Sequence, residues 1–345
     1  MCRRHGRCCA NSPSVSHCVN DEAFLEQAIE AAATARLRTS PNPWVGCVLV
    51  TSDGRSFTGA TEPPGGRHAE RVALDAARVA GADTTGATAY VTLEPCSHHG
   101  RTPPCADALV LAGVSRVVVA VTDPDPKVSG KGIDRLRDAG IEVITGVRAP
   151  EVAEQLAPYL HHRRTGRPFV VLKLATTLDG RIAAADGTSQ WITGIEARTA
   201  AHRLRAESDA IVVGAGTVRA DDPSLTTRLV DGPSPRRVVL GHAPPDAKVH
   251  PCLEWTGPLT ELLDRLGSEG VMQVMVEGGA RVAASFHSAG LVDRYVLHLA
   301  PALMGDGDGA LHGLTTATIG DLWRGRVHSL RRLGDDIEVV LEPVR

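Results

Sequence analysis

The sequence predicts an α/β protein built from two domains. Its 345 residues suffice for two domains of ordinary size, at roughly 100–200 residues each. Short apolar runs bounded by turn residues, such as 44–50, alternate along the chain with longer amphipathic segments, such as 68–80. Strands that alternate with helices in this way favour a largely parallel sheet covered by helices on its faces.

The first half of the chain alternates helices and strands as far as residue 150. Asn20 is a good capping residue for a helix over 20–38, and SPNP at 40–43 then predicts a turn. Further helices are expected at 68–80, 104–113 and 130–139, and strands at 44–50, 87–93, 116–121 and 141–145. The run WVGCVLV at 44–50 is continuously apolar, which is typical of a buried strand.

A polar stretch, HHRRTGR at 161–167, separates the two halves, and Pro168 opens a new strand. We expect residues 1–19 to be a disordered tail, 20–150 the first domain, 151–167 a linker helix and 168–345 the second domain. In the second half, strands are expected at 169–176, 209–214, 236–240, 271–276 and 293–300, and helices at 195–206, 259–268 and 279–289. An antiparallel pair, 326–333 and 336–343, is expected to turn at Gly334-Asp335.

The composition limits the kinds of protein that the chain can be. A net charge of −3 gives no electrostatic reason to expect nucleic acid as a partner. No apolar run approaches the ~20 residues of a membrane span, and no apolar core of a secretory signal follows the first arginines. We therefore expect a cytoplasmic protein whose cysteines are core thiols or metal ligands. Four of the eight cysteines, Cys2, Cys8, Cys9 and Cys18, fall in the expected tail, where a metal-binding segment is the alternative.

Three residues of the first domain have the chemistry of a zinc site. His68 begins an expected helix, while Cys96 and Cys105 flank the next strand-to-helix crossing. Imidazole and thiolate suit Zn²⁺, and three ligands leave one tetrahedral position open for an activated water, as in catalytic sites. Glu70 can reach that water and pass its proton to a leaving amine. We therefore expect one catalytic Zn²⁺ per chain.

The spacing of the cysteines leaves a second interpretation open. The H-x-E and P-C elements match the signature of zinc deaminases, but eight residues separate Cys96 from Cys105 where that signature has two. The alternative is a closed structural zinc site with Cys47 or His98 as the fourth ligand. It would leave Glu70 without a role, and a thiol in the apolar strand at Cys47 is more typical of a buried small side chain.

Long motifs in both halves resemble one enzyme family. They are PNPWVG at 41–46, EPCSHHGRTPPC at 94–105, KLATTLDGR at 173–181, SQWIT at 189–193, GTVRADDPSLTTR at 216–228 and VEGG at 276–279. In order and spacing they resemble the fused deaminase and reductase of riboflavin biosynthesis, over about residues 20–345. The resemblance implies a cytidine-deaminase-like three-layer domain followed by a dihydrofolate-reductase-like α/β domain.

The same resemblance implies two successive reactions on one small molecule. The deaminase would replace the 2-amino group of a diamino-hydroxy-ribosylaminopyrimidine 5′-phosphate by oxygen. The reductase would then convert the ribosyl group into ribityl, with NADPH as the hydride donor. The expected partner is thus a pyrimidine nucleotide, with no nucleic acid and no membrane, and strand-edge pairing favours a homo-oligomer.

In the first domain, the resemblance places Asn42, His98 and Arg101 at substrate-binding positions. Arg101 stands where the family often has Lys, and either can pair with a phosphate. The family often has His seven residues before the zinc His, whereas this chain has Thr61. We therefore expect one family contact to the substrate to be missing.

In the second domain, the resemblance extends to the substrate and the cofactor. The expected substrate-binding residues are Ser189, Arg205, Leu225, Arg228 and Glu277, with Lys173 as the proton-handling or orienting group. The expected cofactor-binding residues are Ala175, Trp191, Thr217, Asp221, and Gly278, Gly279, Ala280 and Arg281 at a helix start. His242 stands where the family commonly has a Ser near the cofactor, and Trp191 is equally compatible with a core aromatic residue.

Simpler interpretations stand beside these. Lys173 could instead be a lysine at a strand edge whose ammonium group reaches water. Arg205 or Arg228 could instead form an ion pair with Asp221 or Asp222. Two rival functions also remain: a deaminase of nucleic-acid bases, and a reductase that carries a structural zinc module. RNA binding would favour the first rival, and absence of deamination by the wild-type chain would favour the second.

Overall fold

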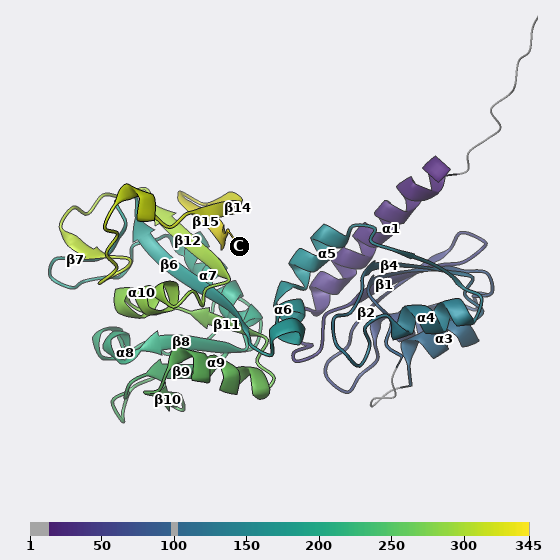
Figure 1. Ribbon diagram of the computed structural model, residues 1–345, viewed down its shortest axis with the longest axis horizontal. Coiled ribbons are helices and arrows are strands. Elements are labelled where there is room, and N and C mark those ends of the chain that lie inside the picture. The colour runs from purple at the N-terminus through teal and green to yellow at the C-terminus, as the bar shows by residue number, and fades with distance from the viewer. Residues whose placement is uncertain (1–13, 98–102, 345) are drawn as a thin grey trace, which may run out of the picture. The chain divides into compact units, whose positions relative to one another are not determined.

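The computed structural model describes residues 14–97 and 103–344, which form two compact units. One unit contains Pro43–Leu156 with the residues before Ser40, and the other contains Ser40–Asn42 with Ala157 and the residues after it. Figure 1 shows that each unit has its own sheet with helices packed against it. The expected zinc ligands belong to the first unit, and the VEGG motif at 276–279 belongs to the second.

A five-stranded sheet forms the centre of the first unit, in the order β2-β1-β3-β4-β5. Its strands are β1 (Gly46–Val50), β2 (Ser56–Ala60), β3 (Thr88–Leu93), β4 (Arg116–Val121) and β5 (Glu142–Thr145). The strands β3, β4 and β5 are parallel, as the sequence predicts, but β1 is antiparallel to both β2 and β3. Strand β2 was not predicted, because it is short and has only Gly59 buried; it follows β1 after a tight turn that only antiparallel strands allow.

Helices on both faces complete three layers in this unit. The helices α1 (Ser14–Ala35) and α5 (Ala149–Gln155) lie on one face, and α2 (Ala69–Val79), α3 (Cys105–Leu111) and α4 (Lys131–Asp138) lie on the other (Figure 1). Two glycines let the helices approach closely. A side chain at Gly46 would strike the carbonyl oxygen of Ala28 in α1, and one at Gly59 would strike that of Ala69 in α2. The second approach fixes the start of α2, where His68 stands, against β2.

The boundaries of two expected helices differ from the structure. Helix α1 begins at Ser14 and ends at Ala35, so Asn20 lies inside it rather than at its cap. The expected linker helix is divided into α5 and α6 (Ala157–Thr165). Pro158 explains the break, because it has no N–H to donate and its ring clashes with the carbonyl four residues earlier. Residues 1–13 of the expected tail lie outside the described residues.

The second unit is built on an eight-stranded sheet, in the order β10-β9-β8-β11-β6-β12-β15-β14. Its strands are β6 (Phe169–Thr177), β8 (Ala210–Gly214), β9 (Arg236–Leu240), β10 (Leu253–Trp255), β11 (Gln273–Val276), β12 (Arg294–Ala300), β14 (Gly325–Leu333) and β15 (Asp336–Pro343). The strands from β10 to β12 are parallel neighbours, whereas β15 is antiparallel to both β12 and β14. The expected final antiparallel pair is confirmed, with Gly334 at a φ of +65° in its turn.

Period-two alternation along β6 decides what faces each side of this sheet. Val170 and Leu172 pack in the core under α9 (Leu259–Ser268) and α10 (Ala280–Ser288). Phe169 and Val171 face the other side, where α7 (Ile195–Glu207) contributes Leu204. Lys173 is next in that second series, so a charged group stands on the α7 side of the central strand. Helix α8 (Ala215–Asp221) packs through Val218 against β8 and β9 on the same side.

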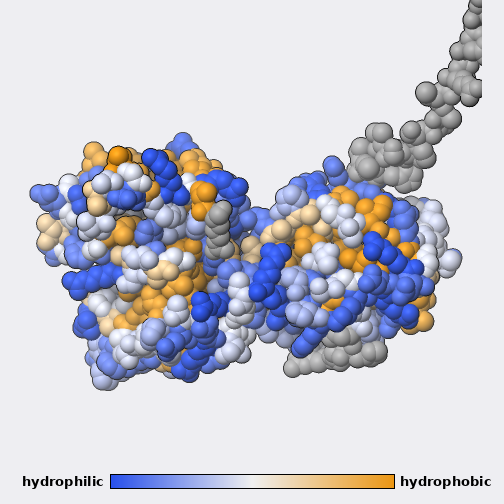
Figure 2. All heavy atoms as spheres, in the orientation of Figure 1, coloured by the Kyte–Doolittle hydropathy of each residue, from blue (hydrophilic) through white to orange (hydrophobic). Residues whose placement is uncertain are grey.

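Shorter elements, which were not predicted from the sequence, complete the second unit. The strands β7 (Arg181–Ala184) and β13 (Gly307–Gly309) form a small antiparallel sheet, and a 3-10 turn, η1, spans Ile319–Asp321. On the face shown in Figure 2, hydrophilic residues border scattered apolar patches in both units. In the described part of the chain, no helix has both the length and the apolar character that a membrane span requires.

Candidate zinc centre and dinucleotide-sized cavity

The three expected zinc ligands come together in the first unit. His68 caps the start of α2, Cys96 follows β3, and Cys105 is the first residue of α3. His68 Nδ1 lies 3.5 Å from Cys96 Sγ and 3.3 Å from Cys105 Sγ. The three ligand atoms all lie within 4.8 Å of one another. Two segments far apart in the sequence thus converge on one point beside the carboxyl end of β3.

This donor set fits a zinc ion. Bonds of ~2.0–2.3 Å at tetrahedral angles put neighbouring nitrogen and sulfur ligands about 3.6 Å apart. The separations of His68 from the two thiols agree with that value. The Cys105 thiol lowers the pKa of Cys96 more than burial raises it, and His68 lowers it further, which favours the thiolate that binds metal. Cys47 is buried in β1 and does not belong to the cluster.

Glu70 lies beside these ligands without joining the cluster. It stands in the first turn of α2 and is only 3% exposed. Burial, and then the charge of Cys96, raises the pKa of Glu70 to about 7. A desolvated carboxyl group two residues after a ligand is therefore in place to exchange protons with a molecule at the open metal position.

Glu94 holds the segment that carries Cys96. Its buried carboxylate accepts backbone N–H groups from Gly130 and Gly132 at 3.0 and 2.9 Å, and from Asp123 at 3.2 Å. Gly132 lies so close to Pro95 that a side chain there would strike the Pro95 carbonyl oxygen. The start of α4 is thereby tied to the residues directly before Cys96, a support that was not predicted from the sequence.

The other residues expected in this site are less defined. Asn42 is partly exposed in the turn before β1, and His98 and Arg101 lie outside the described residues. Thr61 is buried, and its hydroxyl exchanges hydrogen bonds with the backbone of Val45, accepting the N–H at 3.0 Å and donating to the carbonyl at 3.3 Å. Thr61 therefore supports the strand pair β1–β2 where the family often has His.

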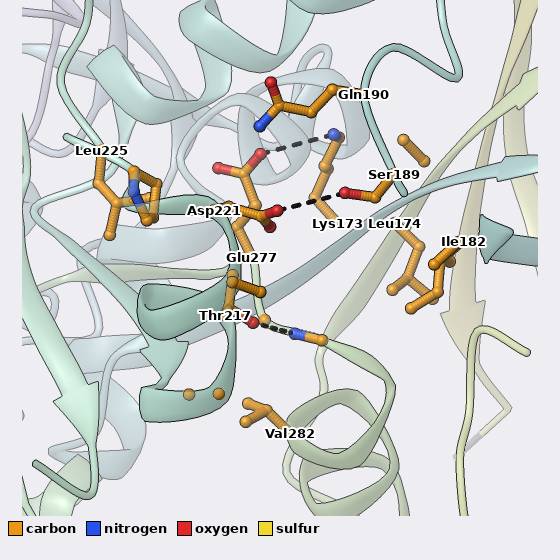
Figure 3. Close-up of a pocket in the computed structure, with 18 of the residues that line it drawn as sticks. Lys173, Leu174, Ile182, Ser189, Gln190, Thr217, Asp221, Leu225, Glu277 and Val282 are labelled. Carbon is orange, nitrogen blue, oxygen red and sulfur yellow. Dashed lines mark hydrogen bonds and ion pairs between the residues drawn. The ribbon is translucent and has the colours of Figure 1, made fainter. Parts of the chain in front are cut away.

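In the second unit, a cavity of about 1570 Å³ opens on the α7 and α8 side of the sheet. It exceeds the roughly 300–1,000 Å³ of a site for one small ligand, so it has room for a dinucleotide and a second molecule. All fourteen residues expected in this domain's site line it: Lys173, Ala175, Ser189, Trp191, Arg205, Thr217, Asp221, Leu225, Arg228, Glu277, Gly278, Gly279, Ala280 and Arg281. Figure 3 shows several of them converging from β6, α8 and the end of β11.

A buried charged cluster occupies the floor of the cavity. Lys173 Nζ lies 3.6 Å from Glu277 Oε1, and Arg205 Nε and Nη2 both lie 2.8 Å from Glu277 Oε2. Burial raises the pKa of Glu277, but Arg205 and Lys173 outweigh it and lower the value to about 2. Burial lowers the pKa of Lys173, and Glu277 opposes that shift. Because β6 is a central strand and Lys173 is 8% exposed, the strand-edge interpretation of this lysine is wrong.

The neighbouring segment 224–228 forms one wall of the cavity. Arg228 is exposed, and its Nη1 donates to Thr226 Oγ1 at 3.0 Å and to the Ser224 hydroxyl. Leu225 is 3% exposed and has a φ of +53°, a conformation that a bulky residue adopts only when its surroundings impose it. Neither arginine pairs with Asp221 or Asp222: Arg205 pairs with Glu277, and Asp222 pairs with Lys248.

Asp221 and Trp191 lie at the entrance. Ser189 Oγ donates to Asp221 Oδ1 at 3.3 Å, and both are drawn in Figure 3. Trp191 is 67% exposed, so the core interpretation is wrong, and the Arg198 guanidinium lies 4.3 Å from its ring centroid. An exposed indole on a cavity wall provides a flat surface for a planar ligand.

The start of α10 has the geometry of a phosphate site. A side chain at Gly278 would strike Val282, so only glycine lets the chain turn into the helix there. The N–H of Gly279 donates to Thr217 Oγ1 at 3.1 Å and is therefore already used. The amides of Ala280 and Arg281 open the helix and have no acceptor within it, which suits an anion. An anion at this helix start would therefore accept from Ala280 and Arg281 rather than from Gly279.

Other cavity residues were missed or differ from expectation. His202 stands one helical turn before Arg205 on α7, a spacing that would have revealed it. The Gln190 amide points toward the pair of Lys173 and Glu277 (Figure 3). His242 lies at the rim, where its Nδ1 is 2.8 Å from the Glu254 carboxylate.

Comparison with known proteins assigns a family to each half of the chain. Residues 19–121 match the family model of the cytidine and deoxycytidylate deaminase zinc-binding region, and residues 168–338 match that of the RibD C-terminal domain. The fold and the sites together define a zinc-binding deaminase domain followed by a reductase domain in one chain. Such a reductase implies a nicotinamide cofactor.

Similar proteins share both domains. The riboflavin biosynthesis protein RibD of Mycobacterium tuberculosis is 44% identical over 330 residues, which cover 92% of this chain and 95% of that protein. A RibD structure from Acinetobacter baumannii has a TM-score of 0.88 at 37% identity and covers 95% of this chain and 100% of its own. A Thermotoga maritima deaminase/reductase has the same TM-score and coverage at 34% identity. The chain belongs to the RibD family and is a bifunctional enzyme of riboflavin biosynthesis.

Proposed function

We propose that this chain performs the two reactions named for its Thermotoga maritima relative, a diaminohydroxyphosphoribosylaminopyrimidine deaminase and a 5-amino-6-(5-phosphoribosylamino)uracil reductase. The first is a hydrolytic deamination that needs no nicotinamide cofactor. The second is an NADPH-dependent reduction of the ribosyl side chain, which gives 5-amino-6-ribitylaminouracil 5′-phosphate. The observation that carries the first reaction is the convergence of His68, Cys96 and Cys105 beside buried Glu70.

In the deaminase, His68, Cys96 and Cys105 hold one Zn²⁺ per chain. A zinc ion in this set would lower the pKa of a water at the open position toward about 7. Glu70 accepts the proton of the attacking water and donates it to the leaving amine, so the carboxylate ends the cycle as it began. Asn42, His98 and Arg101 bind the substrate. Thr61 instead stabilises the β1–β2 strand pair through its hydrogen bonds to Val45.

In the reductase, the cavity holds NADPH and the nucleotide together. NADPH would supply the hydride, and Lys173 orients or protonates the reacting sugar beside it. Glu277 keeps Lys173 and Arg205 fixed, since a buried carboxylate between two cations holds both side chains. The substrate contacts are Ser189, Arg205, Leu225, Arg228 and Glu277. The two arginines bind the ribose phosphate, because the planar guanidinium matches its oxygens.

The cofactor extends over the strand ends toward α10. Its pyrophosphate accepts the N–H groups of Ala280 and Arg281, and the glycines 278 and 279 permit the close approach. Ala175, Trp191, Thr217 and Asp221 complete its contacts. At the rim, His242 with its partner Glu254 faces the cofactor where the family commonly has Ser.

The two activities reside in separable domains. The first domain includes α5, because Gln155 Nε2 donates to the carbonyl of Ile29 in α1 at 2.8 Å. A chain ended at Leu156 should therefore fold and deaminate without NADPH, whereas a chain ended near residue 150 would lose this contact. Insolubility of both the shortened chain and its complement would contradict separable domains.

The active form is a cytoplasmic homo-oligomer. Strand β14 lies at the edge of its sheet and pairs, among the described residues, with β15 alone. Val327 and Leu330 on that strand are 59% and 66% exposed, and these two apolar side chains beside the unpaired backbone are suited to contact with a second chain. Thiolate ligands agree with a reducing compartment. Light scattering of the full chain and of Leu330→Lys tests the association.

A further inference from the structure

The ring of His202 contacts a hydrogen-bond donor at each of its two nitrogens. His202 is 6% exposed on α7 and lines the cavity between Arg205 and the segment that carries Arg228. The backbone N–H of Arg228 lies 2.9 Å from its Nδ1. Arg205 Nη1 lies 3.4 Å from its Nε2. A neutral imidazole has one accepting nitrogen, so it cannot accept from both.

The shorter contact decides which nitrogen carries the proton. The Arg228 N–H can only donate, so Nδ1 must accept and the proton must be on Nε2. The Nε2–H then faces the Arg205 guanidinium, which has no accepting atom. A doubly protonated ring would face donors on both sides. Accordingly burial, and then Arg205 and Arg228, lowers the pKa of His202 to about 4, which keeps the ring neutral at neutral pH.

The Nε2–H of His202 and Nη1 of Arg205 are two donors that face each other, so a third group must supply the acceptor. The nearest carboxylate, Glu277, is already engaged by Arg205 Nε and Nη2 and by Lys173. The remaining Arg205 nitrogen, Nη1, also reaches the Thr226 carbonyl at 3.4 Å and has a second hydrogen for a ligand. An anionic oxygen placed between His202 Nε2 and Arg205 Nη1 would accept from both.

We propose that His202 is a phosphate-binding residue of the reductase site, donating its Nε2–H to an oxygen of the ribose 5′-phosphate that Arg205 also holds. This inference rests on the proposed function, and it adds the neutral imidazole of His202 as a third donor to the phosphate, beside Arg205 and Arg228. The Nδ1 acceptor simultaneously fixes the backbone of Arg228. One ring therefore links the two arginines that bind the anion.

Two substitutions separate the roles of the two nitrogens. His202→Asn keeps an acceptor near Nδ1 for the Arg228 N–H but removes the donor toward the ligand. His202→Gln reaches the Nε2 position with an amide donor but abandons Nδ1. The probes are the KM of the deaminated substrate and competitive inhibition of the full-length enzyme by inorganic phosphate. His287→Asn is the matched control, since His287 is a half-buried histidine of the same unit outside the cavity.

His202→Asn should raise both the KM for substrate and the inhibition constant of phosphate about tenfold, the scale of one hydrogen bond to a charged group. The kcat and the KM for NADPH should stay within about twofold of wild type, since the phosphate lies away from the reacting carbon. His202→Gln should retain more phosphate affinity than His202→Asn and melt at a lower temperature. The control should match wild type in both constants.

Other outcomes reject the inference. If His202→Asn leaves both constants unchanged while Arg228→Ala weakens them, the phosphate site stands and His202 is not part of it. If His202→Asn only lowers the melting temperature, the residue is structural. If neither His202→Asn nor Arg228→Ala changes either constant, the phosphate site of the proposed function is itself misplaced.

Discussion

Lys173 Nζ and Glu277 Oε1 lie 3.6 Å apart on the floor of the cavity, and the pair connects the central strand of the sheet to the arginine on α7. Burial would disfavour every charge in this group. Instead, Arg205 and Lys173 overcome the effect of burial on Glu277 and lower its pKa to about 2. A buried charge is tolerated only when it is paired, so removal of any member leaves the others uncompensated.

Lys173→Ala should lower kcat of the reductase more than it raises the KM for substrate. The amine lies at the floor of the cavity, where the reacting carbon is proposed to bind, rather than at the phosphate. Steady-state kinetics on deaminated substrate measures both constants, and Lys127→Ala, an exposed lysine of the other unit, is the control. An unchanged kcat in Lys173→Ala would show that Lys173 takes no part in the reaction.

Arg228→Ala should weaken substrate binding about 10–100-fold, because a charged hydrogen bond contributes roughly 1.5–3 kcal/mol. Arg228 is exposed and pairs only with hydroxyl groups in the described contacts, so its loss should leave the melting temperature close to wild type. Arg205→Ala should weaken binding and also lower the melting temperature, because Glu277 then loses a partner. Arg236→Ala, a surface arginine outside the cavity, should change neither binding nor melting beyond a small effect.

Glu70→Gln should retain zinc and the fold but lose deamination by at least ~100-fold, the usual scale of general acid–base catalysis. The amide keeps the shape of the carboxyl group and cannot carry the proton. Reductase activity of the same protein, on deaminated substrate, reports whether the chain is intact. Glu30→Gln, on the exposed side of α1, is the matched control. Near-normal deamination would show that Glu70 has another role.

Cys96→Ser and Cys105→Ser should each bind far less zinc than the wild type, which should hold one ion per chain. A hydroxyl is a poor replacement for a thiolate ligand, and each loss leaves two protein ligands. Metal analysis after dialysis measures the zinc content, with Cys252→Ser as the control cysteine outside the cluster. Zinc retained in full by both variants would exclude this site.

The pH dependence of stability should contain a contribution from His202. Its pKa is lowered from 6.5 when unfolded to about 4 when folded, first by burial and then by Arg205 and Arg228, with Glu277 opposing. The unfolded chain therefore takes up the proton first, and stability is lost as pH falls from 6.5 toward 4. Tryptophan fluorescence melts at pH 7 and 5 should show a smaller loss in His202→Asn than in wild type. An equal or larger loss would refute the assigned pKa.

The sequence identified the zinc centre because its chemistry is carried by residue type. His68, Cys96 and Cys105 are ligands in any arrangement that brings them together, and Glu70 follows from its distance along the chain. The role of Glu94 in holding the segment of Cys96 could not be predicted from the sequence. It depends on backbone N–H groups, those of Gly130 and Gly132, which follow the next strand. The short strand β2 was missed since SFTGA has almost no buried side chain.

The prediction of the reductase site rested on the resemblance to a known family rather than on the spacing of residues. Its lining residues come from segments far apart in the chain, and no spacing predicts that Arg205 pairs with Glu277 instead of Asp221. His202 was predictable in principle, from its position three residues before Arg205, which places both side chains on one face of α7. The donor conflict at its ring depends on coordinates, because it involves the backbone of Arg228.

Product analysis tests the central claim most directly. Purified, zinc-loaded protein is incubated with the diaminopyrimidine ribosylamine 5′-phosphate, with and without NADPH, and the products are identified by mass. Without NADPH, the substrate should be converted only to the species in which an oxygen replaces one amine. With NADPH, that species should gain two hydrogens as NADPH is consumed. Failure to exchange the amine under either condition, or reduction with no deamination, would contradict a deaminase and a reductase acting in succession in this chain.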